Sequence, residues 1–136
     1  MHVEPYKPET HEPYLRAWYE QWGALFDAGM LSSEGYVACD DDGPLAAVWV
    51  YRDPSCKVVF VDNVIAERTG RAKNAFAMMG AFRRLWQAVA AACRSAFVIV
   101  QTASPFVIAT LKRDKWTAAP QLATYRATYP FFLKGA

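Results

Sequence analysis

Residues 57–92 decide the fold, and they read K-V-V-F-V-D-N-V-I-A (57–66), E-R-T-G-R-A (67–72) and K-N-A-F-A-M-M-G-A-F-R-R-L-W-Q-A-V-A-A-A (73–92). The first part is rich in β-branched residues and apolar on both faces, which predicts a central strand of a sheet. From about Ala72, apolar residues recur every three or four positions, which predicts a long amphipathic helix. The sequence therefore predicts a buried strand, a short turn and a long helix in succession.

The turn between this strand and helix carries Arg68, Arg71 and Lys73 where the helix begins. The helix macrodipole already places partial positive charge there, so each cation costs roughly 0.3–1 kcal/mol in isolation. Gly70 permits close approach to the backbone, and N–H groups that lack helical partners can hold an anion. The turn therefore predicts a phosphate site. The alternative is three solvated cations on a surface turn, and the turn alone favours neither.

The length and composition favour one globular domain that spans residues 1–136. Hydrophobic residues make up 54% of the chain, which is enough apolar material for a core. No apolar run reaches the roughly 18–20 residues that a membrane span requires, and the start M-H-V-E-P-Y lacks the features of a signal peptide. We therefore expect a cytoplasmic protein that does not associate with a membrane.

The cysteines and the acidic turn argue against a metal cofactor. Cys39, Cys56 and Cys93 are an odd number without the spacing of a metal site, which predicts reduced thiols, mostly in the core. Three consecutive aspartates at 40–42 resemble a metal cluster. Adjacent acids in a tight turn point apart, however, so solvated turn residues are favoured over a Ca²⁺ site.

Charge is distributed unevenly along the chain. Residues 1–53 contain ten acids and three bases, and residues 54–136 contain three acids and twelve bases, so the two parts carry −7 and +9. This asymmetry predicts two different ligands. A basic half also suggests the hypothesis of nucleic-acid binding. No recognition helix, aromatic RNA-binding strand or zinc spacing accompanies it, so that hypothesis is the weakest.

The segment before the central strand predicts three further strands and two helices. An edge strand in residues 1–6 comes first, followed by a helix with Thr10 as N-cap and with Glu12 and Pro13 in its first turn. A short helix is expected near Leu25 to Met30. Two strands follow, at Gly35 to Asp40 and Pro44 to Tyr51, and a D-D-D-G hairpin turn joins them.

After the long helix, Ala96 to Thr102 predicts a buried strand parallel to the central one, because a helix separates the two. Ser104 and Pro105 suit the N-cap and first position of another helix. Residues 115–130 predict two strands with a turn at Pro120 and Gln121. The apolar residues 131–133 either cap the core or form an intermolecular contact.

This order of elements, with E-R-T-G-R-A and the late S-P-F-V-I-A-T-L-K-R-D-K-W, resembles the GNAT superfamily of N-acetyltransferases. The resemblance covers nearly the whole chain and rests on architecture more than on residue identity. It is most similar to the small GNAT-like proteins of bacteriophages. It implies an α/β fold with a mixed central sheet in the order β-α-α-β-β-β-α-β-α-β-β.

The resemblance also implies acetyl-CoA, or another acyl-CoA, as co-substrate. The family's pyrophosphate loop, Gln/Arg-x-x-Gly-x-Gly/Ala, matches this chain at Gly70 and Ala72 and departs from it at Glu67. Pantetheine lies between the fourth and fifth strands in these enzymes, which implies that the Val64 N–H stabilises the oxyanion. The implied cofactor-binding residues are Val64, Ile65, Ala66, Arg68, Thr69, Gly70, Arg71, Ala72, Lys73, Thr102 and Ser104.

Asp62 falls near the family's carboxylate on the fourth strand, so it is the candidate general base. The alternative is that Asp62 only hydrogen-bonds a bulge or neighbouring backbone, and the two interpretations have equal weight. At the position of Leu111 the family carries a tyrosine that acts as the general acid. Leucine cannot donate a proton. Tyr125 or Tyr129 is the candidate replacement, unless water assists the departing thiolate.

Two functions follow from these residues. The first is an acetyl-CoA-dependent N-acetyltransferase whose acceptor is a primary amine of a protein lysine, a polyamine or a small molecule. The second is a GNAT-like protein with weak or no catalysis that binds a host protein, in the host cytoplasm if a phage encodes it; a homodimer is a further hypothesis by analogy. The first is favoured because the cations at the helix start are hard to explain without an anionic ligand.

Overall fold

The structure is a computed structural model that describes residues 1–68, 75–102, 104–118 and 131–134. Its elements are β1 (His2–Pro5), α1 (Pro8–Gln21), the 3₁₀ helix η1 (Ala28–Met30), β2 (Gly35–Asp40), β3 (Gly43–Arg52), β4 (Val58–Ala66), α2 (Ala75–Ala92), β5 (Phe97–Gln101), α3 (Pro105–Arg113), β6 (Thr117–Ala118) and β7 (Phe131–Lys134).

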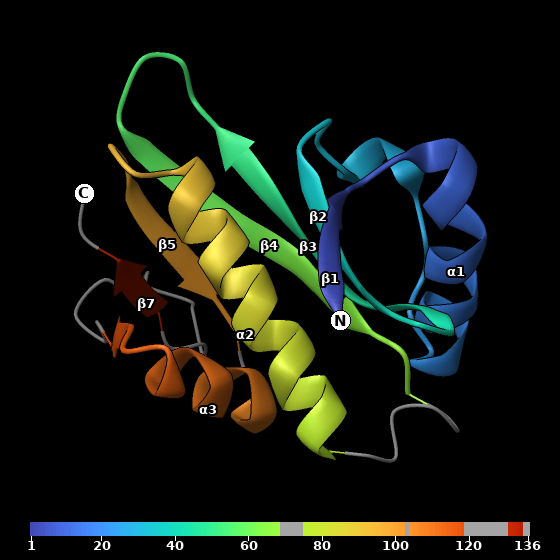
Figure 1. Ribbon diagram of the computed structural model, residues 1–136. Coiled ribbons are helices and arrows are strands. Elements are labelled where there is room, and N and C mark those ends of the chain that lie inside the picture. Colours follow the sequence, from blue (N-terminus) through green and yellow to red (C-terminus); the bar gives the residue numbers. More distant parts are fainter. Residues whose placement is uncertain (69–74, 103, 119–130, 135–136) are drawn as a thin grey trace.

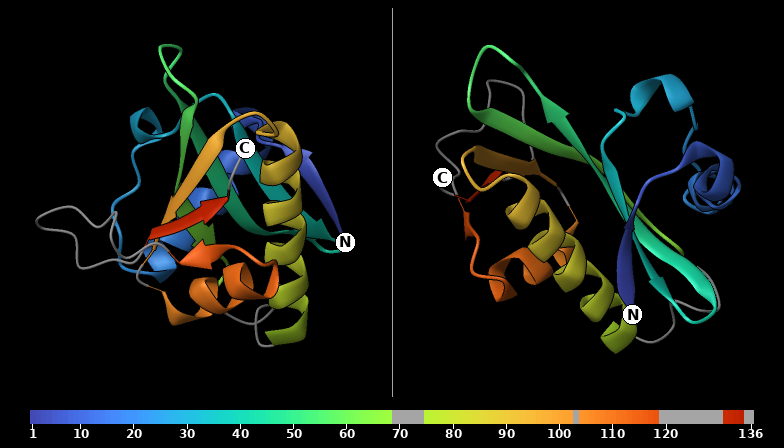
Figure 2. Two further views of the ribbon diagram at one scale, coloured as in Figure 1. Left: turned by 90° about the vertical axis from the view of Figure 1, so that its left-hand side faces the viewer. Right: turned by 45° about the horizontal axis from the view of Figure 1, so that its top comes forward.

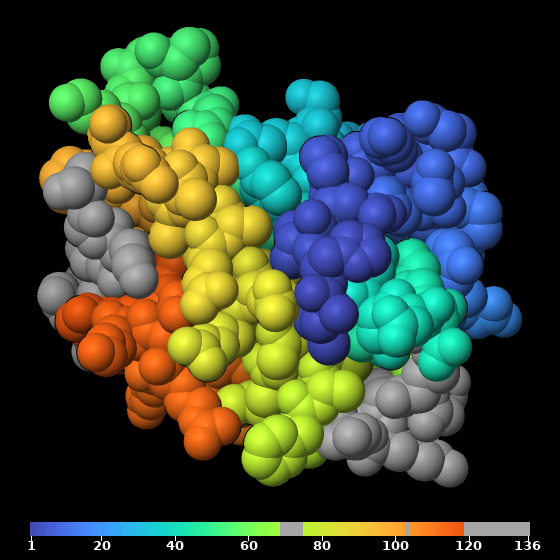
Figure 3. Space-filling model, viewed as in Figure 1, coloured from blue at the N-terminus to red at the C-terminus, as the bar shows by residue number. Residues whose placement is uncertain are grey.

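The strands form one mixed sheet in the order β1-β2-β3-β4-β5-β7-β6. Helix α1 covers one face of this sheet, and α2 and α3 cover the other (Figures 1 and 2). The predicted central strand is confirmed, because β4 lies between β3 and β5. The predicted edge strand is confirmed as well, and the space-filling view shows β1 at the surface beside α2 (Figure 3).

Strands β4 and β5 run parallel, as the intervening helix predicts, with Val58 opposite Phe97 and Val61 opposite Val100. The hairpin of β2 and β3 is also confirmed. Its first aspartate, Asp40, accepts a hydrogen bond from the backbone N–H of Asp42 at 2.8 Å, which is the role of a turn residue.

Helix α1 begins earlier than predicted, at Pro8, so Thr10 is not its N-cap. Lys7 occupies the N-cap position without a side-chain cap, and Pro8 supplies the fixed φ angle that suits the first helical residue. The Lys7 backbone N–H instead donates to Nδ1 of His11 at 2.9 Å. Pro13 consequently lies inside the helix rather than in its first turn.

One further helix is shorter than predicted, and the C-terminal apolar residues form a strand. The short helix expected from Leu25 to Met30 is only η1, where the Asp27 carboxylate accepts the Gly29 N–H at 2.8 Å. The apolar residues 131–133 belong to β7, which pairs antiparallel with both β5 and β6. Without β7, the backbone N–H and C=O groups along this edge of β5 would lack partners, which explains why β7 pairs there. The predicted turn at Pro120 and Gln121 lies outside the described residues.

Two apolar clusters fill the two sides of the sheet. Along β3, Val48 and Val50 face α2, whereas Ala47 and Trp49 face α1, and all four are buried. This alternation buries the strand on both faces. None of the described helices is long and apolar enough to cross a bilayer.

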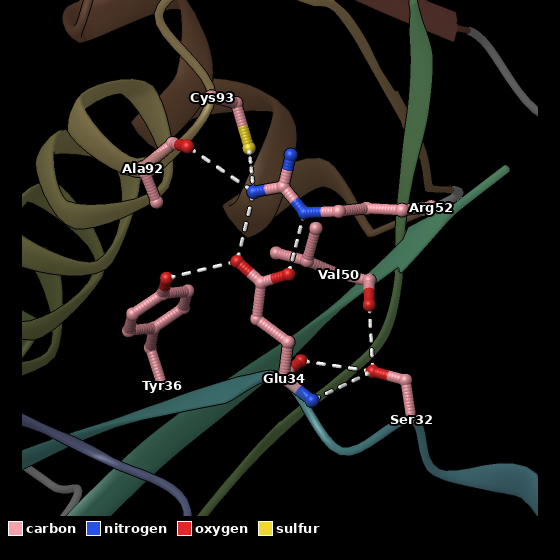
Figure 4. Close-up of polar contacts among 7 residues, drawn as sticks. All are labelled: Ser32, Glu34, Tyr36, Val50, Arg52, Ala92 and Cys93. Carbon is pink, nitrogen blue, oxygen red and sulfur yellow. Dashed lines mark hydrogen bonds and ion pairs between the residues drawn. The ribbon is translucent and has the colours of Figure 1, made fainter. Parts of the chain in front are cut away.

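Arg52 connects the end of β3 to the end of α2 (Figure 4). Its guanidinium donates to both oxygens of Glu34, at 2.6 and 2.9 Å, and to the Ala92 carbonyl at 3.1 Å and the Cys93 sulfur at 3.3 Å. The Tyr36 hydroxyl donates to the same carboxylate at 3.1 Å. Hydrogen bonding from Arg52 lowers the pKa of Glu34, while burial, followed by the Glu34 charge, raises the pKa of Tyr36 to about 12.

Candidate functional site

The main candidate site lies where β4 and β5 separate. The described ladder between the two strands ends at Val61 and Val100, but β4 continues to Ala66. A cavity of about 490 Å³ occupies this place. It is lined by Trp22, Val64, Ile65, Ala66, Glu67, Arg68, Ala75, Met78, Phe82, Thr102, Ser104, Phe106 and Val107.

A bulge at Asn63 changes the direction of β4 just before this cavity. Ala47 pairs with Ile65 and Trp49 pairs with Asp62, so β4 contains one more residue than β3 between these two pairs. Asn63 has a φ angle of 53°, in the left-handed region. Such a bulge bends a strand and re-aims its side chains, which accounts for the separation of β4 from β5.

Side chains hold this bulge in place. The Asp62 carboxylate accepts the backbone N–H of Asn63 at 2.7 Å. The Asn63 amide donates to the hydroxyl of Tyr51, and that hydroxyl donates to the Met30 carbonyl at 2.7 Å. The structure therefore supports the structural interpretation of Asp62 directly, while its role as a base remains a prediction.

The structure brings together six of the predicted cofactor residues in one cavity: Val64, Ile65, Ala66, Arg68, Thr102 and Ser104. It does not bring Asp62 there. Asp62 is exposed on the face of the sheet that α1 covers, beyond the bulge. The remaining predicted residues, Thr69, Gly70, Arg71, Ala72, Lys73 and Tyr125, lie outside the described part of the chain, as does Tyr129.

Two tyrosine hydroxyls lie near Asp62. Burial raises the pKa of Tyr19 and of Tyr51, and the charge of Asp62 acts in the same direction on both. Both phenols therefore stay protonated at neutral pH and can act as hydrogen-bond donors. The sequence did not identify Tyr51, because its proximity to Asp62 depends on the β3–β4 register.

The predicted N-cap of α3 is confirmed at the rim of the cavity. The Ser104 hydroxyl accepts the Val107 N–H at 3.3 Å, and the Ser104 N–H donates to the Thr102 hydroxyl at 3.1 Å. Leu111, which the sequence resemblance aligned with a tyrosine of the GNAT superfamily, is fully buried in the core under α2 and α3.

Sequence reasoning missed Trp22 as a lining residue. Its indole N–H donates to the Ala66 carbonyl at 2.7 Å, and the Arg68 guanidinium carbon lies 4.5 Å from the centre of its ring. Arg68 also binds Gln21, through its backbone N–H at 3.0 Å and its guanidinium at 3.3 Å. The end of α1 therefore holds the end of β4. The only local signal was that Trp22 continues the aromatic spacing of the helix.

The sequence matches no protein-family profile and no curated protein. Solved structures do match it. An aminoglycoside 6′-acetyltransferase superimposes with a TM-score of 0.65 and 12% identity over 99% of this chain and 97% of the other. The ribosomal-protein-S18-alanine N-acetyltransferase of Escherichia coli gives 0.65 and 8% identity over 96% and 89%. The N-acetylglutamate synthase of Neisseria gonorrhoeae, solved with coenzyme A and L-arginine, gives 0.67 and 9% identity over 98% of this chain and 32% of the other.

Proposed function

We propose that this chain, which has the fold of the GCN5-related N-acetyltransferases, binds acetyl-CoA and transfers its acetyl group to a primary amine. The observation that carries the proposal is the cavity at the point where β4 parts from β5. Six residues expected to hold an acyl-CoA line that cavity. The similar structures include one solved with coenzyme A and several named for acetyl transfer to amines.

The lining fits the two chemical parts of such a ligand. Met78, Phe82 and Phe106 provide apolar surface for the alkyl segments of pantetheine, and residues 64–66 provide strand backbone for its amides. The Arg68 side chain supplies positive charge at one end. The sequence of the turn, residues 68–73, supports binding of the pyrophosphate at that same end.

The chemistry of transfer is assigned to residues on either side of the bulge, with Asp62 before it and Val64 after it, at the cavity. In the proposed reaction the amine nitrogen forms a bond to the thioester carbon, the carbon–sulfur bond breaks, and the Asp62 carboxylate accepts the proton that the amine loses. The Val64 N–H stabilises the charge that develops on the carbonyl oxygen. Tyr125 remains the proposed donor of a proton to the thiolate.

Charge supports a cationic acceptor. Residues 1–53, which include α1 and the hairpin of β2 and β3, carry a net charge of −7. Asp62 is exposed on the same face as α1. An acidic surface attracts a protonated amine and raises its local concentration. A protein lysine, a polyamine and an aminated small molecule all meet this requirement.

Titration calorimetry with acetyl-CoA tests the cofactor part of the proposal. We expect the wild-type protein to show saturable binding at micromolar concentration. The double variant Arg68→Ala with Arg71→Ala should lose about tenfold or more in affinity for acetyl-CoA for each arginine removed, because charge-assisted hydrogen bonds contribute about 1.5–3 kcal/mol. The matched control is Arg83→Ala with Arg84→Ala, which removes the same charge from an exposed part of α2. Absence of binding at millimolar acetyl-CoA, or equal weakening in both double variants, contradicts the proposal.

Asp62→Asn tests the proposed base separately. Amine-dependent release of free thiol should fall by about 10²–10⁴-fold, because a positioned base contributes that much, while the affinity for acetyl-CoA stays unchanged. Turnover at the wild-type rate would leave Asp62 with its structural role at the bulge alone.

A second candidate function is a catalytically weak protein of this fold that binds a host protein. The observation that favours it is Leu111, which is buried in the core at the position of the family's tyrosine. The same titration distinguishes the two functions. A protein that binds only a protein partner gives no heat with acetyl-CoA, and Asp62→Asn leaves its partner binding intact.

A further inference from the structure

Side chains from β1, β2 and α1 converge at the edge of the sheet, three strands away from β4. His2 lies directly opposite Cys39 in the antiparallel pair, and Glu4 lies two residues further along the same face of β1. The ligand atoms of these three residues all lie within 4.8 Å of one another. Cys39 is buried in the cluster under α1, whereas the His2 side chain is 60% exposed.

A second histidine orients this group. His11 on α1 is only 1% exposed, and its Nδ1 accepts the Lys7 backbone N–H at 2.9 Å. The proton of the neutral ring must therefore lie on Nε2, which donates to Oε1 of Glu4 at 2.6 Å. The other carboxylate oxygen, Oε2, is thereby directed to within 3.1 Å of the His2 Nε2.

We propose that His2 Nε2, Glu4 Oε2 and Cys39 Sγ bind a zinc ion, with His11 as the residue that positions Glu4. Imidazole, carboxylate and thiolate are the ligand types that zinc prefers, whereas Ca²⁺ and Mg²⁺ require oxygen ligands. The hydrogen bond from a buried neutral histidine to a metal-binding carboxylate is the outer support such sites commonly have.

The spacing suits a tetrahedral ion. Two N or O ligands that are each roughly 2.0 Å from zinc lie about 3.3 Å apart, close to the 3.1 Å between His2 and Glu4. Closing the distance to the Cys39 sulfur requires a small side-chain movement, which the exposed His2 can make. Binding converts the Cys39 thiol to a thiolate and releases its proton to solvent. Three protein ligands leave a fourth position for water.

Cobalt titration of the full chain tests the site, because Co²⁺ replaces zinc and reports its ligands by absorption. We expect one equivalent of Co²⁺ to produce a near-ultraviolet thiolate-to-cobalt charge-transfer band that Zn²⁺ abolishes. Cys39→Ala should lose the band, and Cys56→Ala, which removes an exposed thiol, should keep it. A cobalt spectrum without this band in the wild-type protein, or loss of the band in Cys56→Ala, overturns the proposal.

His2→Ala keeps the test decisive even if the buried Cys39 variant does not fold, since His2 is exposed. It should weaken cobalt affinity by at least the roughly 10–100-fold that loss of an outer-shell partner costs. His11→Gln should weaken it within that range while keeping the charge-transfer band, because His11 positions Glu4 without touching the metal. Zinc should also raise the melting temperature of the wild-type protein with increasing concentration, and not that of His2→Ala. Unchanged affinity in His2→Ala contradicts the assignment.

Discussion

At the scale of single residues, the indole of Trp49 packs closely against the backbone of Gly35. Trp49 is fully buried between β2 and α1, and its N–H donates to no acceptor among the described residues. A Cβ atom added to Gly35 would lie 2.5 Å from the indole nitrogen. No other side chain fits at Gly35 unless the tryptophan moves, because both partners belong to the close-packed core.

Gly35→Ala should therefore lower the free energy of unfolding by about 1–3 kcal/mol, the usual cost of overpacking a core. Denaturant unfolding measures this change. Gly80→Ala is the matched control, since no atom lies within 4 Å of the added Cβ and the position is inside α2. It should stabilise the protein by roughly 0.5–1 kcal/mol. Equal effects of the two substitutions on the free energy of unfolding would show that the contact with Trp49 does not determine the cost of Gly35→Ala.

At the scale of elements, a buried hydrogen bond joins α2 to α3. The Trp86 indole N–H donates to the Thr110 hydroxyl at 2.9 Å, and that hydroxyl donates to the Val107 carbonyl at 2.7 Å. Trp86 is fully buried, and Thr110 is 2% exposed. A single hydroxyl therefore satisfies an indole donor that has no access to water, and it holds α3 in place beside the proposed cofactor cavity.

Thr110→Val should cost about 1–3 kcal/mol of unfolding free energy, because it keeps the shape of the side chain but leaves a buried N–H without a partner. Thr110→Ser retains the hydroxyl and loses one methyl group, so it should cost less. Chemical denaturation of the two variants side by side measures the difference. A valine variant as stable as the serine variant would mean that the indole finds another acceptor.

At the scale of the whole molecule, the Arg52 and Glu34 pair joins the start of β2 and the end of β3 to the C-terminal end of α2. The Glu34 pKa is lowered in the folded state. Its contribution to stability is therefore present above the ordinary value of 4.5, which applies to the unfolded chain, and is lost as pH falls through the lower folded value.

Glu34→Gln should consequently reduce stability by about 1 kcal/mol near neutral pH, since both partners are partly exposed, and the difference from wild type should shrink below pH 4.5. Unfolding free energies measured across this range check the sign. Glu12→Gln, which removes the partner of the exposed Arg16 within α1, serves as the control, because such an i,i+4 pair on a helix contributes only about 0.3–0.5 kcal/mol. A difference that grows at acid pH would contradict the assignment.

Local patterns determined most of the architecture. The β-branched residues of β4, the helical spacing of α2, and Ser104 followed by Pro105 each act through neighbours in the chain, so sequence alone predicted them. The six residues of the cavity followed from a resemblance based on the order of these elements. The start of α1 was misplaced because Thr10 and Pro8 both suit a helix start, and Pro8 comes first.

Tertiary structure alone decided the contacts between distant segments. Trp22 reaches Ala66 across 44 positions, the bulge at Asn63 requires the register of β3, and β7 is inserted beside β5 rather than following β6 at the edge. Cys39 meets His2 only because their strands pair. Hydrophobic period and capping act over a few residues, whereas these contacts depend on which strand edges and faces meet once the core has formed, and no local pattern carries that information.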